Sequence, residues 1–124
     1  MRILSFSIGH DASATILENG RVSFYLSAER ITRKKHCDRI IHVLKYLHTN
    51  RYTKFDLVAV NLYRLDDRKF EEPLKKLFRD EFQCKEVIFD YERHHIYHAY
   101  SGFYNSHFND AICIILDGHG SSVS

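Results

Sequence analysis

Two histidines and one aspartate in the second half of the sequence have the types and spacing of metal ligands. His94 and His98 are four residues apart, so on a helix they lie on one side, about one turn from each other. Asp117 follows an apolar run. Two imidazoles and a carboxylate form a facial set for iron, zinc or a similar divalent ion. The alternative is that the histidines are partly exposed helix residues and Asp117 only begins a turn.

His10 and Asp11 follow the first apolar segment, in a Gly-His-Asp sequence typical of a tight turn. A histidine held by a carboxylate can take a proton from an attacking hydroxyl group, which predicts a catalytic role for this pair. The alternative is a turn that contains aspartate because its side chain forms local hydrogen bonds.

A basic run lies between Glu29 and Asp38. It contains Arg30, Arg33, Lys34, Lys35 and His36. Such a density of cations is sufficient to bind an anion such as phosphate. The run is also compatible with a solvated surface.

The first three elements are expected to be strands. Apolar and polar residues alternate over residues 2–8, as in a half-buried strand. Residues 12–17 and 21–28 flank Asn19-Gly20, a strong signal for a two-residue hairpin turn. We therefore expect a three-stranded antiparallel meander.

The remaining sequence alternates between helical and strand patterns. Strands are expected over residues 55–62, 87–89 and 111–116. A helix with Pro73 in its first turn lies between the first two of them. Two further helices have apolar stripes: one, capped by Asp38, has Ile40, Val43, Leu44 and Leu47, and the other has the core-facing residues Ile96, Ala99, Tyr100 and Phe103. This order, βββαβαβαβ, predicts an α/β fold with a mixed sheet whose later strands are parallel. Parallel strands would bring His94, His98 and Asp117 to the carboxyl edge of the sheet, where ligands collect in open α/β folds.

Composition limits the possible classes of protein. The chain has 124 residues, 44% of them hydrophobic, which suits one domain with one core. A formal net charge of +2 gives no indication of nucleic-acid or membrane partners. Polar residues interrupt the first apolar stretch, no long apolar run follows, and the three cysteines lack CxxC spacing, so we expect no signal peptide or transmembrane helix and a cytoplasmic protein with buried, reduced thiols.

Four motifs together resemble a known family, the O-carbamoyltransferases of the NodU/CmcH type, which modify antibiotics and nodulation factors. The motifs are Gly9-His10-Asp11-Ala12-Ser13-Ala14, Glu29-Arg30-Ile31-Thr32-Arg33-Lys34-Lys35-His36, His94-His95-Ile96-Tyr97-His98-Ala99 and Asp117-Gly118-His119-Gly120. Their order and spacing extend the resemblance over the whole chain. The resemblance implies an actin-like, Hsp70-type (ribonuclease H-like) lobe, which begins with a three-stranded meander.

The resemblance also implies an activity and a set of site residues. Members use ATP and carbamoyl phosphate to form a carbamoyl-adenylate, then transfer the carbamoyl group to a hydroxyl of a small molecule or sugar. By resemblance, His94, His98 and Asp117 bind a divalent metal, most typically Fe²⁺, and His10 with Asp11 lie beside the acceptor hydroxyl. Arg33 and Lys35 help to hold the carbamoyl or phosphate group, and Gly118 and Gly120 belong to a nucleotide-binding turn.

In this interpretation residues 1–124 are the N-terminal lobe of a longer carbamoyltransferase domain, inactive alone. A further metal carboxylate, most of the nucleotide pocket and the carbamoyl-adenylate-forming domain lie downstream in the family. A complementing polypeptide or self-association would then cover the exposed face of the lobe. The alternatives are a non-catalytic metal- or nucleotide-binding module, a threonylcarbamoyl transferase acting on tRNA, and a small non-haem iron oxygenase.

Overall fold

The computed structural model describes residues 1–62, 69–91 and 93–116. The chain divides into two compact units, Met1–Tyr91 and Glu92–Ser124, and each is described by itself. The first unit contains β1 (Arg2–Ile8), β2 (Ser13–Glu18), β3 (Arg21–Ser27), α1 (Ala28–Thr32), α2 (Ile41–Thr49), β4 (Leu57–Leu62), α3 (Glu71–Phe82) and β5 (Glu86–Asp90). The second contains α4 (His94–Tyr104).

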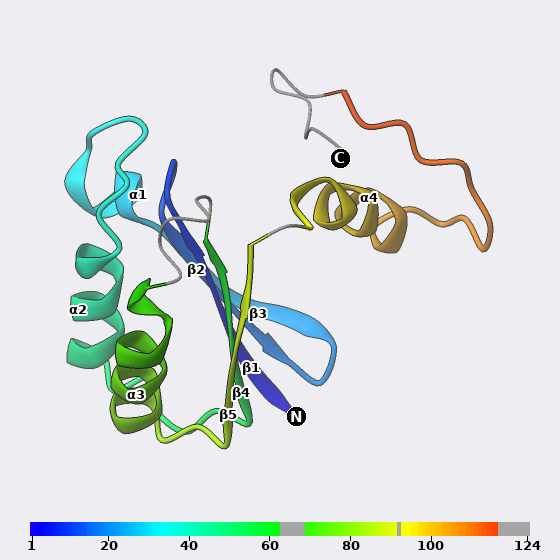
Figure 1. The fold of residues 1–124 in the computed structure, drawn as a ribbon. Coiled ribbons are helices and arrows are strands. Elements are labelled where there is room, and N and C mark those ends of the chain that lie inside the picture. Colours follow the sequence, from blue (N-terminus) through cyan, green and yellow to red (C-terminus); the bar gives the residue numbers. More distant parts are fainter. Residues whose placement is uncertain (63–68, 92, 117–124) are drawn as a thin grey trace. The chain divides into compact units, whose positions relative to one another are not determined.

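The first unit is built on a mixed five-stranded sheet in the order β3-β2-β1-β4-β5 (Figure 1). β1, β2 and β3 form the expected antiparallel meander. The turn between β2 and β3 has φ values of 52° at Asn19 and 79° at Gly20, which agrees with the hairpin signal. β4 and β5 add on the other side of β1, each parallel to its neighbour, so the sheet as a whole is not a simple meander.

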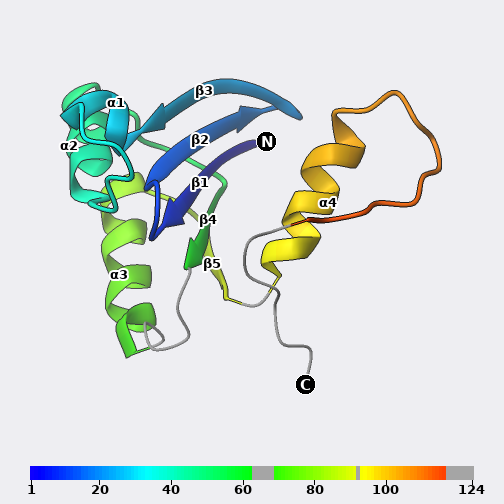
Figure 2. The same ribbon diagram turned by 90° about the horizontal axis from the view of Figure 1, so that it is seen from above.

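The core lies between the sheet and the helices of the first unit. α2 and α3 lie on the same face of the sheet in both views (Figures 1 and 2). Phe6 of β1 stacks on Phe78 of α3 with ring centroids 5.1 Å apart, and Phe82 lies 5.6 Å from the Phe6 ring. All three side chains are fully buried or nearly so. The period of strand and helix therefore points each apolar stripe toward one shared layer, as the sequence pattern predicts.

Some expected boundaries are wrong. Asp38 does not cap α2, whose N-cap residue is Ile40, and the next strand begins at Leu57 rather than at residue 55. The short helix α1 was not expected, because its five residues are too few to show a helical period. The apolar stripe expected for α2 is confirmed, with Val43 and Leu47 fully buried.

The largest correction concerns residues 111–116. They form no strand, and the exposed fractions of Ile112 and Leu116 reach 94% and 93%. A strand needs a neighbouring strand to bond its N–H and C=O groups, and α4 is the one regular element among the described residues of this unit. The stripe expected on α4 is confirmed only in part, since Ala99 and Phe103 are half-buried while Ile96 and Tyr100 are exposed.

The three cysteines are free thiols, but none is fully buried as expected: Cys37 and Cys84 are half-buried and Cys113 is exposed. None of the helices in the described part of the chain has the length and apolar character needed to cross a membrane.

Replacing Phe78 with alanine is expected to destabilise the first unit by about 3–5 kcal/mol, because it removes a buried ring from the aromatic layer and leaves a cavity. Leu77→Ala, at the adjacent and half-exposed position of α3, is the matched control and should cost far less. Urea unfolding followed by circular dichroism measures both. Equal effects of the two substitutions would contradict the assigned core.

Asp56 links the start of β1 to the loop before β4. Its Oδ2 accepts a hydrogen bond from the Arg2 backbone N–H at 2.8 Å, and its Oδ1 accepts one from Lys85 Nζ at 3.3 Å. The backbone bond chiefly, and Lys85 next, hold the pKa of Asp56 below its usual value. A lowered pKa in the folded state means that the carboxylate stabilises the fold above the unfolded pKa and loses this effect as the pH falls through the folded pKa.

Asp56→Asn is therefore expected to lower stability at neutral pH, and the difference from the unsubstituted protein should shrink below about pH 4, the usual range of an aspartate. Chemical unfolding at several pH values measures this. Asp80→Asn, at an exposed aspartate of α3, controls for the loss of one negative charge. A difference that stays constant down to strongly acidic pH would refute the linkage.

Candidate functional site

His10, Asp11 and His36 meet at one place on the first unit. His10 Nδ1 lies 2.6 Å from Asp11 Oδ2, and His36 Nδ1 lies 3.1 Å from Asp11 Oδ1. The two imidazole rings face each other with centroids 4.6 Å apart and planes inclined by 30°. All three side chains are open to solvent, with exposed fractions of 65%, 45% and 64%. One carboxylate thus holds two histidines that a solvent-borne ligand can reach.

The order of the strands explains why these residues meet. β1 and β3 are both antiparallel to β2, so they run in the same direction and end at the same edge of the sheet. The pairings place Ser7 opposite Ser13, and Ser13 opposite Ser27, across that edge. His10 and Asp11 follow β1, and His36 follows α1, which begins where β3 ends. The segment after β1 and the segment after β3 therefore both lie at the same edge of the sheet.

Two backbone hydrogen bonds at Ala12 fix the two segments against each other. The Ala12 N–H donates to the Cys37 carbonyl oxygen at 3.0 Å, and the Ala12 carbonyl accepts from the Ala28 N–H at 2.7 Å. Ala12 has no exposed surface. Since Ala12 follows Asp11 and Cys37 follows His36, the bond between them sets the distance between the aspartate and the histidine.

Two residues of the cluster have a left-handed backbone conformation. Asp11 has φ = 60° and His36 has φ = 56°, left-handed values that few residues other than glycine adopt. Asparagine, aspartate and histidine tolerate this region better than most residues do. Such conformations persist where the surrounding structure fixes them, and they are common at functional sites.

Arg33 and Lys35, which were expected to hold an anion, lie in the loop that leads to His36. α1 ends at Arg33, a left-handed C-cap whose N–H bonds the Glu29 carbonyl at 2.8 Å. Thr32 Oγ1 accepts a hydrogen bond from the Lys34 N–H at 3.3 Å and so fixes the first part of the loop. The two basic side chains are exposed. Their role in anion binding stays a prediction.

His36 is the residue of this cluster that the sequence reasoning did not assign to a catalytic or metal site. In the sequence it stands at the end of the basic run between Glu29 and Asp38. The signal that could have found it was present in the predicted meander, because loops that follow the first and third strands of a meander lie at the same edge of the sheet.

The second predicted site rests on α4. His94 and His98 lie four residues apart within this helix, so the backbone supports the expected spacing. Their proposed partner Asp117, and Gly118 and Gly120 of the nucleotide-binding turn, lie outside the described residues. The argument that a parallel strand over 111–116 brings Asp117 to the histidines loses its basis, since that segment is not a strand. The three-ligand metal site stays a prediction.

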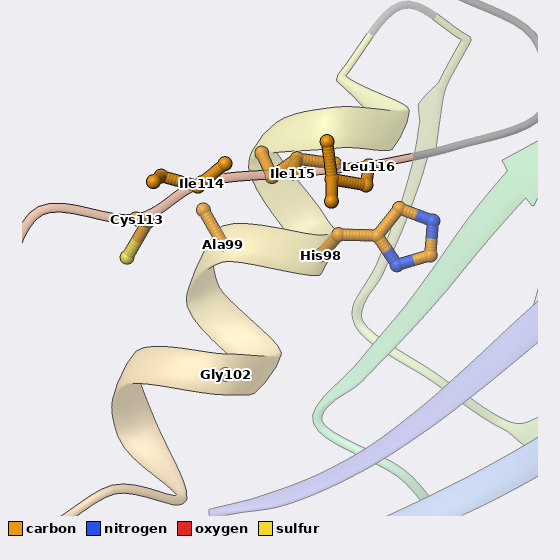
Figure 3. Close-up of a pocket in the computed structure, with 7 residues that line it drawn as sticks. All are labelled: His98, Ala99, Gly102, Cys113, Ile114, Ile115 and Leu116. Atoms are coloured by element: carbon orange, nitrogen blue, oxygen red, sulfur yellow. The ribbon is translucent and has the colours of Figure 1, made fainter.

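Within the second unit, α4 and the extended segment before residue 117 line a groove of about 460 Å³. Its lining residues are His98, Ala99, Gly102, Cys113, Ile114, Ile115 and Leu116. Figure 3 shows the extended segment crossing the helix beside Ala99, with the His98 ring near Leu116. Gly102 faces open space, because a Cβ there would meet no atom within 4 Å.

No protein-family model matches the sequence. The chain is similar to an uncharacterized protein of Methanocaldococcus jannaschii, with 33% identity over 132 residues. The similarity covers 98% of this chain but 23% of that protein, so the chain spans less than a quarter of the length of the relative it matches.

Substitutions at Asp11 are expected to separate backbone strain from side-chain chemistry. Asp11→Asn tolerates the left-handed conformation and should change the free energy of unfolding little. Asp11→Val should destabilise by about 1–2 kcal/mol, because a branched side chain clashes in this conformation. Thermal unfolding of both variants tests this. Equal stability of the two would mean that the turn is not held in the described conformation.

The metal site predicted on α4 can be tested by measuring the affinity of the purified chain for ferrous ion under anaerobic conditions. Near-stoichiometric ferrous binding is expected at this site, and a His94→Ala/His98→Ala variant should bind less ferrous ion than the unsubstituted chain. His107→Ala, outside α4 in the same unit, is the matched control. Unchanged ferrous binding in the double variant would show that the prediction is wrong.

Proposed function

We propose that this chain is the leading part of an O-carbamoyltransferase, which transfers a carbamoyl group from an activated donor to a hydroxyl of a small molecule or sugar. The observation that carries the proposal is the meeting of His10 and Asp11 with His36. These residues belong to two of the four motifs on which the resemblance rests, and 25 positions separate Asp11 from His36. The actin-like lobe is part of the same proposal, and a mixed sheet that begins with a meander is compatible with it.

The contacts around His10 suit a general base. When Nδ1 donates its proton to Asp11, the other ring nitrogen carries the lone pair and can accept a proton. That nitrogen takes the proton of the acceptor hydroxyl while the hydroxyl oxygen forms a bond to the carbamoyl carbon. The bond from this carbon to the phosphate oxygen of the donor then breaks. Asp11 holds the ring and stabilises the imidazolium that forms.

Arg33 and Lys35 supply positive charge close to the base in sequence. Arg33 lies three positions and Lys35 one position before His36, in the loop that the Ala12–Cys37 hydrogen bond joins to the turn with His10 and Asp11. Cations in this loop would stabilise the negative charge that develops on the departing phosphate. Arginine suits this role because its planar guanidinium matches the geometry of phosphate oxygens.

ATP and carbamoyl phosphate are the proposed co-substrates, and a divalent metal, Fe²⁺ most typically, is the proposed cofactor. His94 and His98 have the donor type and the helical spacing for such an ion, and Asp117 would complete the set. The metal would contribute Lewis-acid stabilisation of the nucleotide phosphates. Because the chain spans less than a quarter of its relative, residues beyond this chain would complete the nucleotide pocket.

A fusion experiment tests the proposal. The full chain replaces the corresponding N-terminal segment of an O-carbamoyltransferase with a known acceptor, and mass spectrometry follows the carbamoylated acceptor in the presence of ATP and carbamoyl phosphate. Product formation is expected. His10→Gln should lower the rate by about 10²- to 10⁴-fold, because it removes the general base.

His48→Gln is the matched control, since His48 is an exposed histidine of α2 in the same unit. Its effect on the transfer rate should be small. A folded fusion protein without transfer activity would contradict the carbamoyltransferase assignment and favour a non-catalytic binding module. Equal rates for the His10→Gln and unsubstituted fusions would overturn the role of His10.

A further inference from the structure

We propose that His10, Asp11 and His36 also form a binding site for a divalent metal ion of the zinc type. This site is separate from the one predicted around His94 and His98, and it does not depend on the carbamoyltransferase assignment. One ligand atom from each of the three residues can be chosen so that all three lie within 4.8 Å of one another.

The distances suit a small tetrahedral ion. Zinc binds imidazole nitrogen and carboxylate oxygen at about 2.0–2.2 Å, so ligand atoms around it lie about 3.3–3.5 Å apart. The two Nδ1 atoms lie 2.6 Å and 3.1 Å from the nearest Asp11 oxygens, slightly closer than these values. An ion would replace the hydrogen bonds between the groups, and each imidazole nitrogen would then move away from its nearest Asp11 oxygen by less than about 1 Å.

The protein holds the ligands in place before an ion binds. The backbone bond between Ala12 and Cys37 joins the two segments at the residues directly after Asp11 and His36. The Ala28 N–H anchors the same alanine from the end of β3. A site with fixed backbone positions loses little conformational freedom on binding, which favours affinity.

The charges around the site affect which ligand would occupy the fourth coordination position of the ion. Three protein ligands leave a fourth position of a tetrahedral ion to water or to an anion, as in catalytic rather than structural zinc sites. Asp11 supplies a single negative charge, while Arg33, Lys34 and Lys35 in the same loop are exposed cations. This balance favours an anionic oxygen ligand, of the phosphate or hydroxide type, at the fourth position.

His10 cannot bind the metal through Nδ1 and act as the proposed general base at the same time. A metal bound to His10 Nδ1 requires the proton of the neutral ring to be on the other nitrogen, which then has no lone pair to accept the acceptor proton. If the proposed function holds, zinc binding here therefore inhibits transfer. This consequence alone rests on the proposed function, whereas metal binding can be measured without it.

The test uses the full chain, freed of metal by chelation, and Co²⁺ as a spectroscopic substitute for Zn²⁺. Titration is expected to give one Co²⁺ bound at this site, with the visible absorption of a tetrahedral ion, which Zn²⁺ then displaces. Asp11→Asn and His36→Asn both remove a ligand but tolerate the left-handed backbone. Each should weaken binding by about 10- to 100-fold or more.

Two control variants locate the site. His48→Asn removes an exposed histidine elsewhere in the first unit, and the His94→Ala/His98→Ala variant removes the histidine pair of α4. Both should retain the tetrahedral Co²⁺ spectrum. His10→Gln provides an independent ligand deletion at a side chain that is 65% exposed, so its effect does not depend on folding of the turn.

The proposal is overturned if His10→Gln binds Co²⁺ as tightly as the unsubstituted chain, or if the double variant on α4 abolishes the tetrahedral spectrum. Circular dichroism of every variant separates loss of a ligand from loss of the fold. Because metal binding and carbamoyl transfer are measured separately, a fusion protein that is inactive with no zinc-type ion present, but that binds added Co²⁺ through Asp11, would refute the proposed function while supporting this site.

Discussion

Ala12 bonds both of its backbone polar groups to segments that are distant in sequence, and its side chain is completely buried. Its N–H reaches the loop that contains His36, and its carbonyl reaches the first residue of α1. A larger side chain at this position would have to displace one of these segments. The arrangement of His10, Asp11 and His36 depends on this one residue, because the bond to Cys37 joins the positions directly after the aspartate and the second histidine.

The sheet and its aromatic layer hold the strand that leads to Ala12 in place. β1 is the central strand, pairing with β2 on one side and β4 on the other. Phe6 of β1 packs on Phe78 and Phe82 of α3, which fixes the strand from which the Gly-His-Asp turn emerges. The turn can hold left-handed residues because the segments on both sides of it are anchored, by the core and by the Ala12 bonds.

The chemistry of the cluster admits two uses that share a physical origin. Asp11 accepts from an imidazole when that imidazole carries a proton on Nδ1, and the same carboxylate becomes a ligand beside it when a metal replaces the proton. A general base and a metal site are therefore alternative states of one arrangement. The basic loop around Arg33 would attract an oxygen anion in either proposed state, since its positive charge is independent of how the cluster is occupied.

Sequence alone determined the strand meander, the parallel later strands and the apolar faces of α2 and α3, because these follow from periods of two and 3.6 residues and from the Asn19-Gly20 turn. It also identified His10 and Asp11 as residues with possible chemistry. It failed at residues 111–116, where an apolar run indicates burial without showing which strand would pair with it. Only the tertiary structure decided that His36 joins Asp11, because that contact depends on a backbone bond between residues 25 positions apart, which no local pattern encodes.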